Sequence, residues 1–116
     1  MRRSSEPFWW LLFAAGGTVA ALLVPVSIVL TGLAAPLGWG GSAFQHARMA
    51  TLVSHPIARL YLFVLITLPW FHAAHRIRYG VAEGLRLHRA GRQLAAICYG
   101  TASVGAVLAL LVVVRL

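Results

Sequence analysis

The chain has 116 residues, of which 60% are hydrophobic and only 10% charged, and its formal net charge is +8. A soluble domain usually carries about 25% charged residues, so this composition excludes a small water-soluble globule and makes lipid the expected solvent. The positive charge does not indicate nucleic-acid binding, because the arginines flank apolar runs, as the basic flanks of membrane spans do beside anionic lipid headgroups.

Three apolar runs predict three transmembrane helices, at about residues 8–33, 56–76 and 94–114. A membrane-spanning helix needs about 20 predominantly apolar residues, and each run meets that length. The first run contains no charged residue at all. We therefore expect an all-α integral membrane protein with a single domain over residues 1–116.

Proline and glycine separate the first two predicted spans. Residues 36–42 contain one proline and three glycines, which break a helix. A short amphipathic helix is predicted next, around residues 43–53. Small residues also recur at four-residue spacing within the spans, for example at Gly16 and Ala20 in the first span and at Thr101, Gly105 and Ala109 in the third. Such spacing lets membrane helices pack closely, but small residues are also simply common in membrane helices, and both interpretations remain open.

Arginine is distributed unevenly over the predicted connections. The N-terminal segment carries Arg2 and Arg3, whereas the first connection carries only Arg48. Five more arginines lie at and after the end of the second predicted span, at Arg76, Arg78, Arg86, Arg89 and Arg92. The positive-inside rule then places the N-terminus and the second connection in the cytoplasm. With three spans, the C-terminus falls on the outer, periplasmic side.

This orientation gathers the side chains that can support chemistry. They are Trp9, Trp10, His72, His75 and Arg76. All five are predicted at the cytoplasmic end of the membrane spans. An ionisable group at membrane depth indicates function by default.

His72 and His75 are three residues apart and share a helix face, with Arg76 beside them. For His75 and Arg76, a functional site and an interfacial cluster that only fixes topology are both open. The positive-inside rule already accounts for the arginines that follow.

Three kinds of chemistry come into question for these side chains. The first and third spans contain no histidine, so the chain can give at most one ligand to a haem, from His72, His75 or His55, with a partner giving the other. An ion-coupled transporter usually needs a carboxylate within the bilayer, but Glu6 and Glu83 both lie outside the predicted spans. Quinone chemistry remains, because it needs aromatic walls and N–H donors that indole, imidazole and guanidinium groups provide at the membrane edge.

Several segments carry a resemblance to a known family. They combine an acidic residue, proline, an aromatic pair and Gly-Gly before a proline–glycine break, an apolar Tyr-Leu-Phe segment, Leu-Pro and His-Arg. The segments are residues 5–17, 33–38, 57–63, 68–69 and 75–76. Together they resemble the D anchor of bacterial fumarate reductase, one of the two small membrane subunits of that complex. The resemblance covers roughly residues 5–80, and the third span matches only as an apolar run.

The resemblance implies a concrete role in anaerobic respiration. Members of this family, together with a C anchor subunit, hold a flavoprotein and an iron–sulfur subunit to the bacterial cytoplasmic (inner) membrane. They share a menaquinol site near the cytoplasmic face. By resemblance, Trp10, His75 and Arg76 take part in that site, and His72 is a weaker candidate. The anchor does not reduce fumarate itself, flavin and iron–sulfur clusters belong to the partners, and no haem is expected.

One part of the family pattern differs in this chain. Arg78 and Tyr79 stand where the family type has further histidines after the His-Arg pair. A proton path through those histidines is therefore not expected here. Two alternatives stay open, namely a haem-binding anchor of succinate dehydrogenase and a small transporter or channel subunit.

Overall fold

A computed structural model describes residues 6–116 of the chain. The described part consists of helices and turns and contains no strand, which confirms the all-α prediction. Its helices are α1 (Glu6–Ile28), which continues as a π-helix (Val29–Ala34), then α2 (His46–Ser54), α3 (Pro56–Gly84) and α4 (Gly91–Arg115). Three helical stretches are long and apolar enough to cross a membrane, Pro7–Ala34, Pro56–Gly84 and His88–Arg115.

The first span begins and ends as its sequence dictates. Pro7 lies in the first turn of α1, where its missing N–H would have no intrahelical partner. The last turns widen into the π-helix Val29–Ala34. The chain then turns through Gly38, Gly40 and Gly41, all with positive φ, a conformation that glycine adopts at little cost. The predicted break between the first two spans is therefore confirmed.

The second span is longer than predicted, because α3 continues past residue 76 to Gly84. It ends in a Schellman motif: Arg86 has φ 53°, and the N–H of Leu87 donates to the carbonyl of Ala82 at 2.9 Å. A helix of 29 residues is about 43 Å long at the usual rise, whereas the hydrocarbon layer is about 30 Å thick. The loss of apolar residues after Ala74 thus marks the expected edge of the lipid, not the end of the helix.

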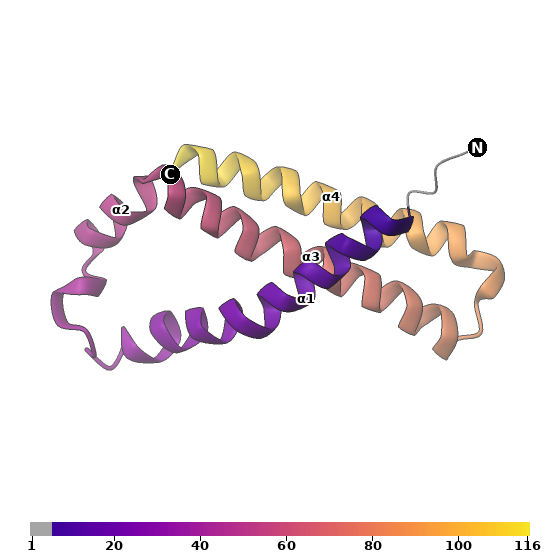
Figure 1. Cartoon of the computed structure of the whole chain (residues 1–116), viewed down its shortest axis with the longest axis horizontal. Coiled ribbons are helices and arrows are strands. Elements are labelled where there is room, and N and C mark those ends of the chain that lie inside the picture. The colour runs from indigo at the N-terminus through magenta and orange to yellow at the C-terminus, as the bar shows by residue number, and fades with distance from the viewer. Residues whose placement is uncertain (1–5) are drawn as a thin grey trace.

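The three long helices are arranged around α3. Helix α4 runs antiparallel beside α3, and α1 crosses α3 at a steep angle (Figure 1). The start of α1 lies near the connection between α3 and α4, while α2 and the C-terminus lie at the other end (Figure 1). The cytoplasmic assignment of the first of these ends remains a prediction, and Arg2 and Arg3, on which it partly rests, lie outside the described residues.

Glycines set the close approach of the helices. A Cβ on Gly16 would overlap the backbone carbonyl oxygen of Leu68 and would lie 2.9 Å from Cβ of His72. A Cβ on Gly105 would lie 3.2 Å from ring atoms of Trp70. These two small residues are therefore used for packing within the chain, α1 on α3 and α3 on α4.

Among the described residues, the buried ones are few and small. They are Gly16, Ala34, Thr67, Ala74, Ala102 and Val113. Most large apolar side chains face outward, as expected where lipid and partner helices replace water. Several serine and threonine hydroxyl groups donate to carbonyls of their own helix, for example Thr67, which donates to the carbonyl of Phe63 at 2.6 Å. The chain thus presents most of its apolar surface to lipid or to other subunits.

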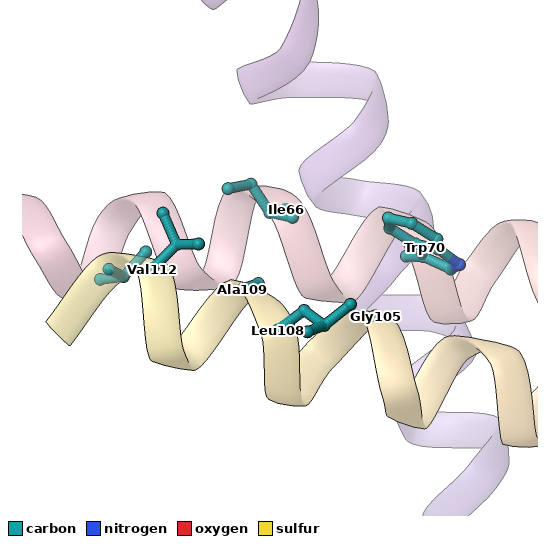
Figure 2. A pocket seen from close by; sticks show the side chains of 7 residues that line it. Ile66, Trp70, Gly105, Leu108, Ala109 and Val112 are labelled. Carbon is teal, nitrogen blue, oxygen red and sulfur yellow. The ribbon is translucent and has the colours of Figure 1, made fainter. Parts of the chain in front are cut away.

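An apolar groove of about 320 Å³ runs between α3 and α4 (Figure 2). Ile66 and Trp70 line it from α3, and Gly105, Leu108 and Val112 line it from α4 (Figure 2). The groove offers hydrocarbon contacts along the seam of the two helices. The imidazole, phenol and guanidinium groups that could bind a polar ligand lie nearer the connection between α3 and α4.

Candidate functional site

All three long helices contribute to a polar cluster near the start of α1. Nδ1 of His75, on α3, lies 2.6 Å from the hydroxyl oxygen of Tyr99, on α4. Arg78 donates from Nη1 to the same oxygen at 3.4 Å. Trp9, on α1, stacks on the ring of Tyr99 with centroids 5.5 Å apart. The cluster therefore joins the three helices through side chains.

Helical spacing explains how α3 contributes two polar groups to this cluster. His75 and Arg78 are three residues apart, so both lie on the face of α3 that meets α4. The guanidinium carbon of Arg78 also lies 5.0 Å from the ring centroid of Tyr79 and 5.4 Å from that of Tyr99. These distances are typical of cation–π contacts. Arg78 is half-buried in this setting.

A hollow of about 530 Å³ opens beside the cluster. It is lined by Trp9, Trp10, His75, Arg78, Tyr79 and Tyr99. We call it the tryptophan hollow. Trp10 is 67% exposed, so its indole stands at the open side of the hollow, where lipid or another subunit would cover it.

A second hollow, of about 450 Å³, adjoins the first. It is lined by Phe13, His75, Arg76, Tyr79, Gly80 and Glu83, and we call it the Arg76 hollow. The two hollows share His75 and Tyr79. The structure thus brings Trp10 and His75 together, as expected, but places Arg76 in the neighbouring hollow.

His72 has different surroundings and lines neither hollow. Its Nδ1 lies 2.9 Å from the backbone oxygen of Phe13, and because a carbonyl can only accept, Nδ1 carries the hydrogen. Its ring stacks on that of Phe13 with centroids 4.4 Å apart and 8° between the planes. His72 therefore fastens α1 to α3 at their crossing, a role that the sequence did not predict. Its assignment as a quinone ligand stays a prediction.

Sequence reasoning missed Tyr99, because the third span was interpreted only as an apolar run. Counting residues from the connection between α3 and α4 could have indicated that Tyr99 lies opposite His75. In an antiparallel pair of helices, residues equally far from the connection face each other, since both arms rise equally per residue. His75 and Tyr99 are each twelve residues from Leu87, near the middle of the connection. Nearly the same count brings Trp70 opposite Gly105, as the structure shows.

The fold and the site together define an integral membrane subunit with three spans and an aromatic, imidazole and guanidinium site at one end. The family model for the D subunit of fumarate reductase matches residues 1–114. The chain belongs to this family of fumarate reductase D subunits.

Individual relatives agree with this assignment. The chain is 51% identical to the fumarate reductase D subunit of Mycobacterium bovis BCG over 104 residues, which cover 90% of this chain and 82% of that protein. The same values hold for the protein of Mycobacterium tuberculosis H37Rv. The protein of Aliivibrio salmonicida is 39% identical over 110 residues, which cover 94% of this chain and 90% of that protein.

The family match confirms the resemblance and extends it. The motifs in the sequence carried the resemblance over roughly residues 5–80, whereas the match reaches residue 114 and so includes the third span. Together with the three membrane-spanning helices, it identifies a multi-pass membrane protein with an anchor role in fumarate reductase.

Proposed function

We propose that this chain anchors a four-subunit quinol:fumarate reductase and contributes side chains to its menaquinol site. The companions would be the flavoprotein, the iron–sulfur subunit and the C anchor subunit. The observation that carries the proposal is the tryptophan hollow, where Trp10 and His75 meet at one end of the spans. In the proposed orientation, this end faces the cytoplasm at the bacterial inner membrane.

The lining of the hollow suits a quinone. A quinone head is flat and apolar, and its two carbonyl oxygens gain negative charge on reduction. Indole and phenol rings supply flat walls, and imidazole and guanidinium groups supply N–H donors. The volume of about 530 Å³ also lies within the usual range for small-molecule sites.

The side chains would divide the work as follows. His75 would hydrogen-bond a quinone oxygen and help to move its proton. Trp10 would provide an aromatic wall and an N–H at the open side of the hollow. Arg76, reaching from the adjoining hollow, would stabilise negative charge on the quinone head. Because both hollows are open, residues of partner subunits would complete the site.

The chain would take no direct part in the reduction of fumarate. Quinol oxidation releases two electrons and two protons. The electrons would pass to iron–sulfur clusters in the neighbouring subunit and then to flavin, where fumarate becomes succinate. This division of labour assigns the chain the quinol end of the reaction.

Purification of the tagged chain from its native membrane in mild detergent tests the anchor role. We expect three companion subunits by mass, together with flavin and iron–sulfur absorption in the visible spectrum. A chain that purifies alone, or only with copies of itself, would contradict the proposal.

Two substitutions test the quinone site in the assembled complex. His75→Leu should lower quinol oxidation by about 100-fold or more, the usual contribution of a proton-transfer residue. Arg76→Leu should lower it by about 10- to 100-fold through lost charge stabilisation. His46→Leu and Arg48→Leu are matched controls, since both residues are exposed on α2 at the other end of the molecule. Normal turnover in both site variants would sink the site assignment.

A further inference from the structure

The hydrogen bond between His75 and Tyr99 determines which nitrogen of the imidazole is available to a ligand. Nδ1 is engaged by the Tyr99 hydroxyl at 2.6 Å. Among residues 6–116, Nε2 of His75 has no hydrogen-bond partner. Since His75 lines both hollows, Nε2 is the nitrogen left for a bound molecule.

Arg78 favours one direction for this hydrogen bond: if Nδ1 also donated to the Tyr99 oxygen, the hydroxyl hydrogen would have no acceptor among residues 6–116. A guanidinium group only donates, so the bond from Arg78 to Tyr99 makes the phenol oxygen an acceptor. The hydroxyl hydrogen of Tyr99 is then available to donate to Nδ1 of His75. In a neutral imidazole, the other nitrogen then carries the hydrogen. This arrangement gives Arg78 an acceptor and pairs the Tyr99 hydroxyl with Nδ1 of His75.

Tyr99 is itself held firmly in place. Its ring stacks on Trp9 at 5.5 Å and 27°, and the guanidinium of Arg78 lies over it. The imidazole of His75 is bounded on its other sides by Phe13, with centroids 4.5 Å apart, and Tyr79, with centroids 4.8 Å apart. The rotation of the imidazole is thus limited by aromatic contacts from α1, α3 and α4.

We infer that Tyr99 is a positioning residue for the quinone site. While the site is empty or holds oxidised quinone, its hydroxyl holds His75 with Nδ1 as acceptor, so that the N–H of Nε2 is the donor offered to a quinone oxygen. To take a proton from quinol, His75 adopts the other neutral tautomer, in which Nδ1 donates to the Tyr99 oxygen and Nε2 accepts. Arg78 supports this arrangement by donating to the Tyr99 oxygen, which leaves the hydroxyl hydrogen for Nδ1 of His75. The inference rests on the proposed function and adds a residue of the third span to the site.

Nitrogen-15 NMR of the histidine-labelled complex in lipid tests the inference directly. His75→Gln identifies the resonances of His75, since four other histidines are present. We expect a hydrogen on Nε2 and a hydrogen-bonded acceptor signal from Nδ1. Tyr99→Phe should shift the Nδ1 signal or split it into two populations. A wild-type imidazole with its hydrogen on Nδ1 would overturn the inference without any variant of Tyr99.

Kinetics with a short-chain naphthoquinol provide the second test. Tyr99→Phe keeps the ring that stacks on Trp9 and removes only the hydroxyl. We expect the KM for the quinol to rise about tenfold, the factor that one lost hydrogen bond represents. Tyr61→Phe is the matched control, because the Tyr61 hydroxyl also links two helices, 3.0 Å from the Ser27 hydroxyl oxygen, but away from both hollows.

The outcomes separate the inference from the proposed function. If His75→Gln impairs quinol oxidation while Tyr99→Phe behaves like Tyr61→Phe, the positioning role is wrong and the quinone site stands. If His75→Gln and Tyr99→Phe both match the wild type, the site assignment fails together with the inference. Should Tyr99→Phe not assemble, Arg78→Met in the assembled complex should move the Nδ1 signal in the same way, and an unchanged signal would overturn the inference.

Discussion

His72 and His75 lie one turn apart on the same helix, yet they occupy different environments. His72 donates to the backbone oxygen of Phe13 at 2.9 Å, at the crossing of α1 and α3. His75 bonds the side chain of Tyr99 at 2.6 Å and lines two hollows. The first histidine fastens two helices, whereas the second faces two hollows, where we propose that it hydrogen-bonds a quinone.

The difference arises from what each neighbouring helix offers. At the crossing, α1 presents glycine, and a Cβ on Gly17 would lie 2.9 Å from Cε1 of His72. The imidazole there fills the space that glycine leaves and satisfies its N–H on the backbone. Nearer the connection, α4 presents a tyrosine, and the hollows open around the second imidazole. A histidine in a membrane helix is thus defined by the surface opposite it, and not by its position in the sequence alone.

The most sensitive test of this comparison measures both quinol turnover and stability in variants of the two histidines. His75→Leu should lower quinol turnover by about 100-fold or more, and His72→Leu should lower it less per assembled complex. In the opposite sense, His72→Leu should destabilise the complex more, by about 1–3 kcal/mol, because it removes a part-buried hydrogen bond and a ring stack at the crossing. Turnover per complex and the thermal unfolding midpoint would be measured together. Equal effects on both quantities would remove the distinction.

A substitution at Gly16 tests the close packing of α1 on α3. Because a Cβ there would overlap the carbonyl oxygen of Leu68, Gly16→Ala should push α1 away from α3 and destabilise the protein by about 1–3 kcal/mol. Gly100→Ala is the matched control, since nothing lies within 4 Å of the added Cβ. Thermal unfolding of the purified complex gives the comparison. A Gly16→Ala complex as stable as the Gly100→Ala complex would show that the close approach is not needed.

Much of the fold could be predicted because each span has a strong apolar pattern. The runs at residues 8–33, 56–76 and 94–114 correspond to the three long helices. The extension of α3 to Gly84 could not be read from hydropathy, since the helix continues where its sequence becomes polar. Its end depends on Arg86 in a left-handed conformation, which glycine usually adopts. Gly80 and Gly84, which come before Arg86, lie inside the helix and therefore do not mark its end.

The arrangement of the candidate site could be predicted only in part, for a similar reason. Aromatic and basic residues at one end of the spans indicated Trp10 and His75, and the tryptophan hollow brings them together. The separation of Arg76 into the adjoining hollow depends on the rotation of α3 relative to α1. Composition and the positive-inside rule carry no information about that rotation. The contribution of Tyr99 required the pairing of α3 with α4.

Arg59 resembles His72, because it links helices through hydrogen bonds to backbone oxygens. Arg59 donates from Nε to the backbone oxygen of Val53 and from Nη1 to that of Val114, at 3.3 Å in each case. It thereby holds α2 and the end of α4 to the start of α3, and a cation at a helix C-terminus is favourable. Arg59→Leu should destabilise the protein by about 1 kcal/mol, measured by thermal unfolding against Arg48→Leu. A defect in quinol turnover at normal stability would instead indicate that Arg59 acts in the quinone site and not in packing.

The smallest expected effect concerns the connection that sets His75 opposite Tyr99. Arg86 adopts φ 53°, a conformation that disfavours residues with a Cβ. Arg86→Gly should therefore stabilise the helix end by about 0.5 kcal/mol, after the greater entropy of glycine in the unfolded chain is subtracted. Thermal unfolding measures the gain, and the Nδ1 signal of His75 shows whether the pairing of α3 with α4 is kept. If stability falls instead, the Arg86 side chain contributes contacts that outweigh its backbone strain, and the connection belongs with the fastening elements of the molecule.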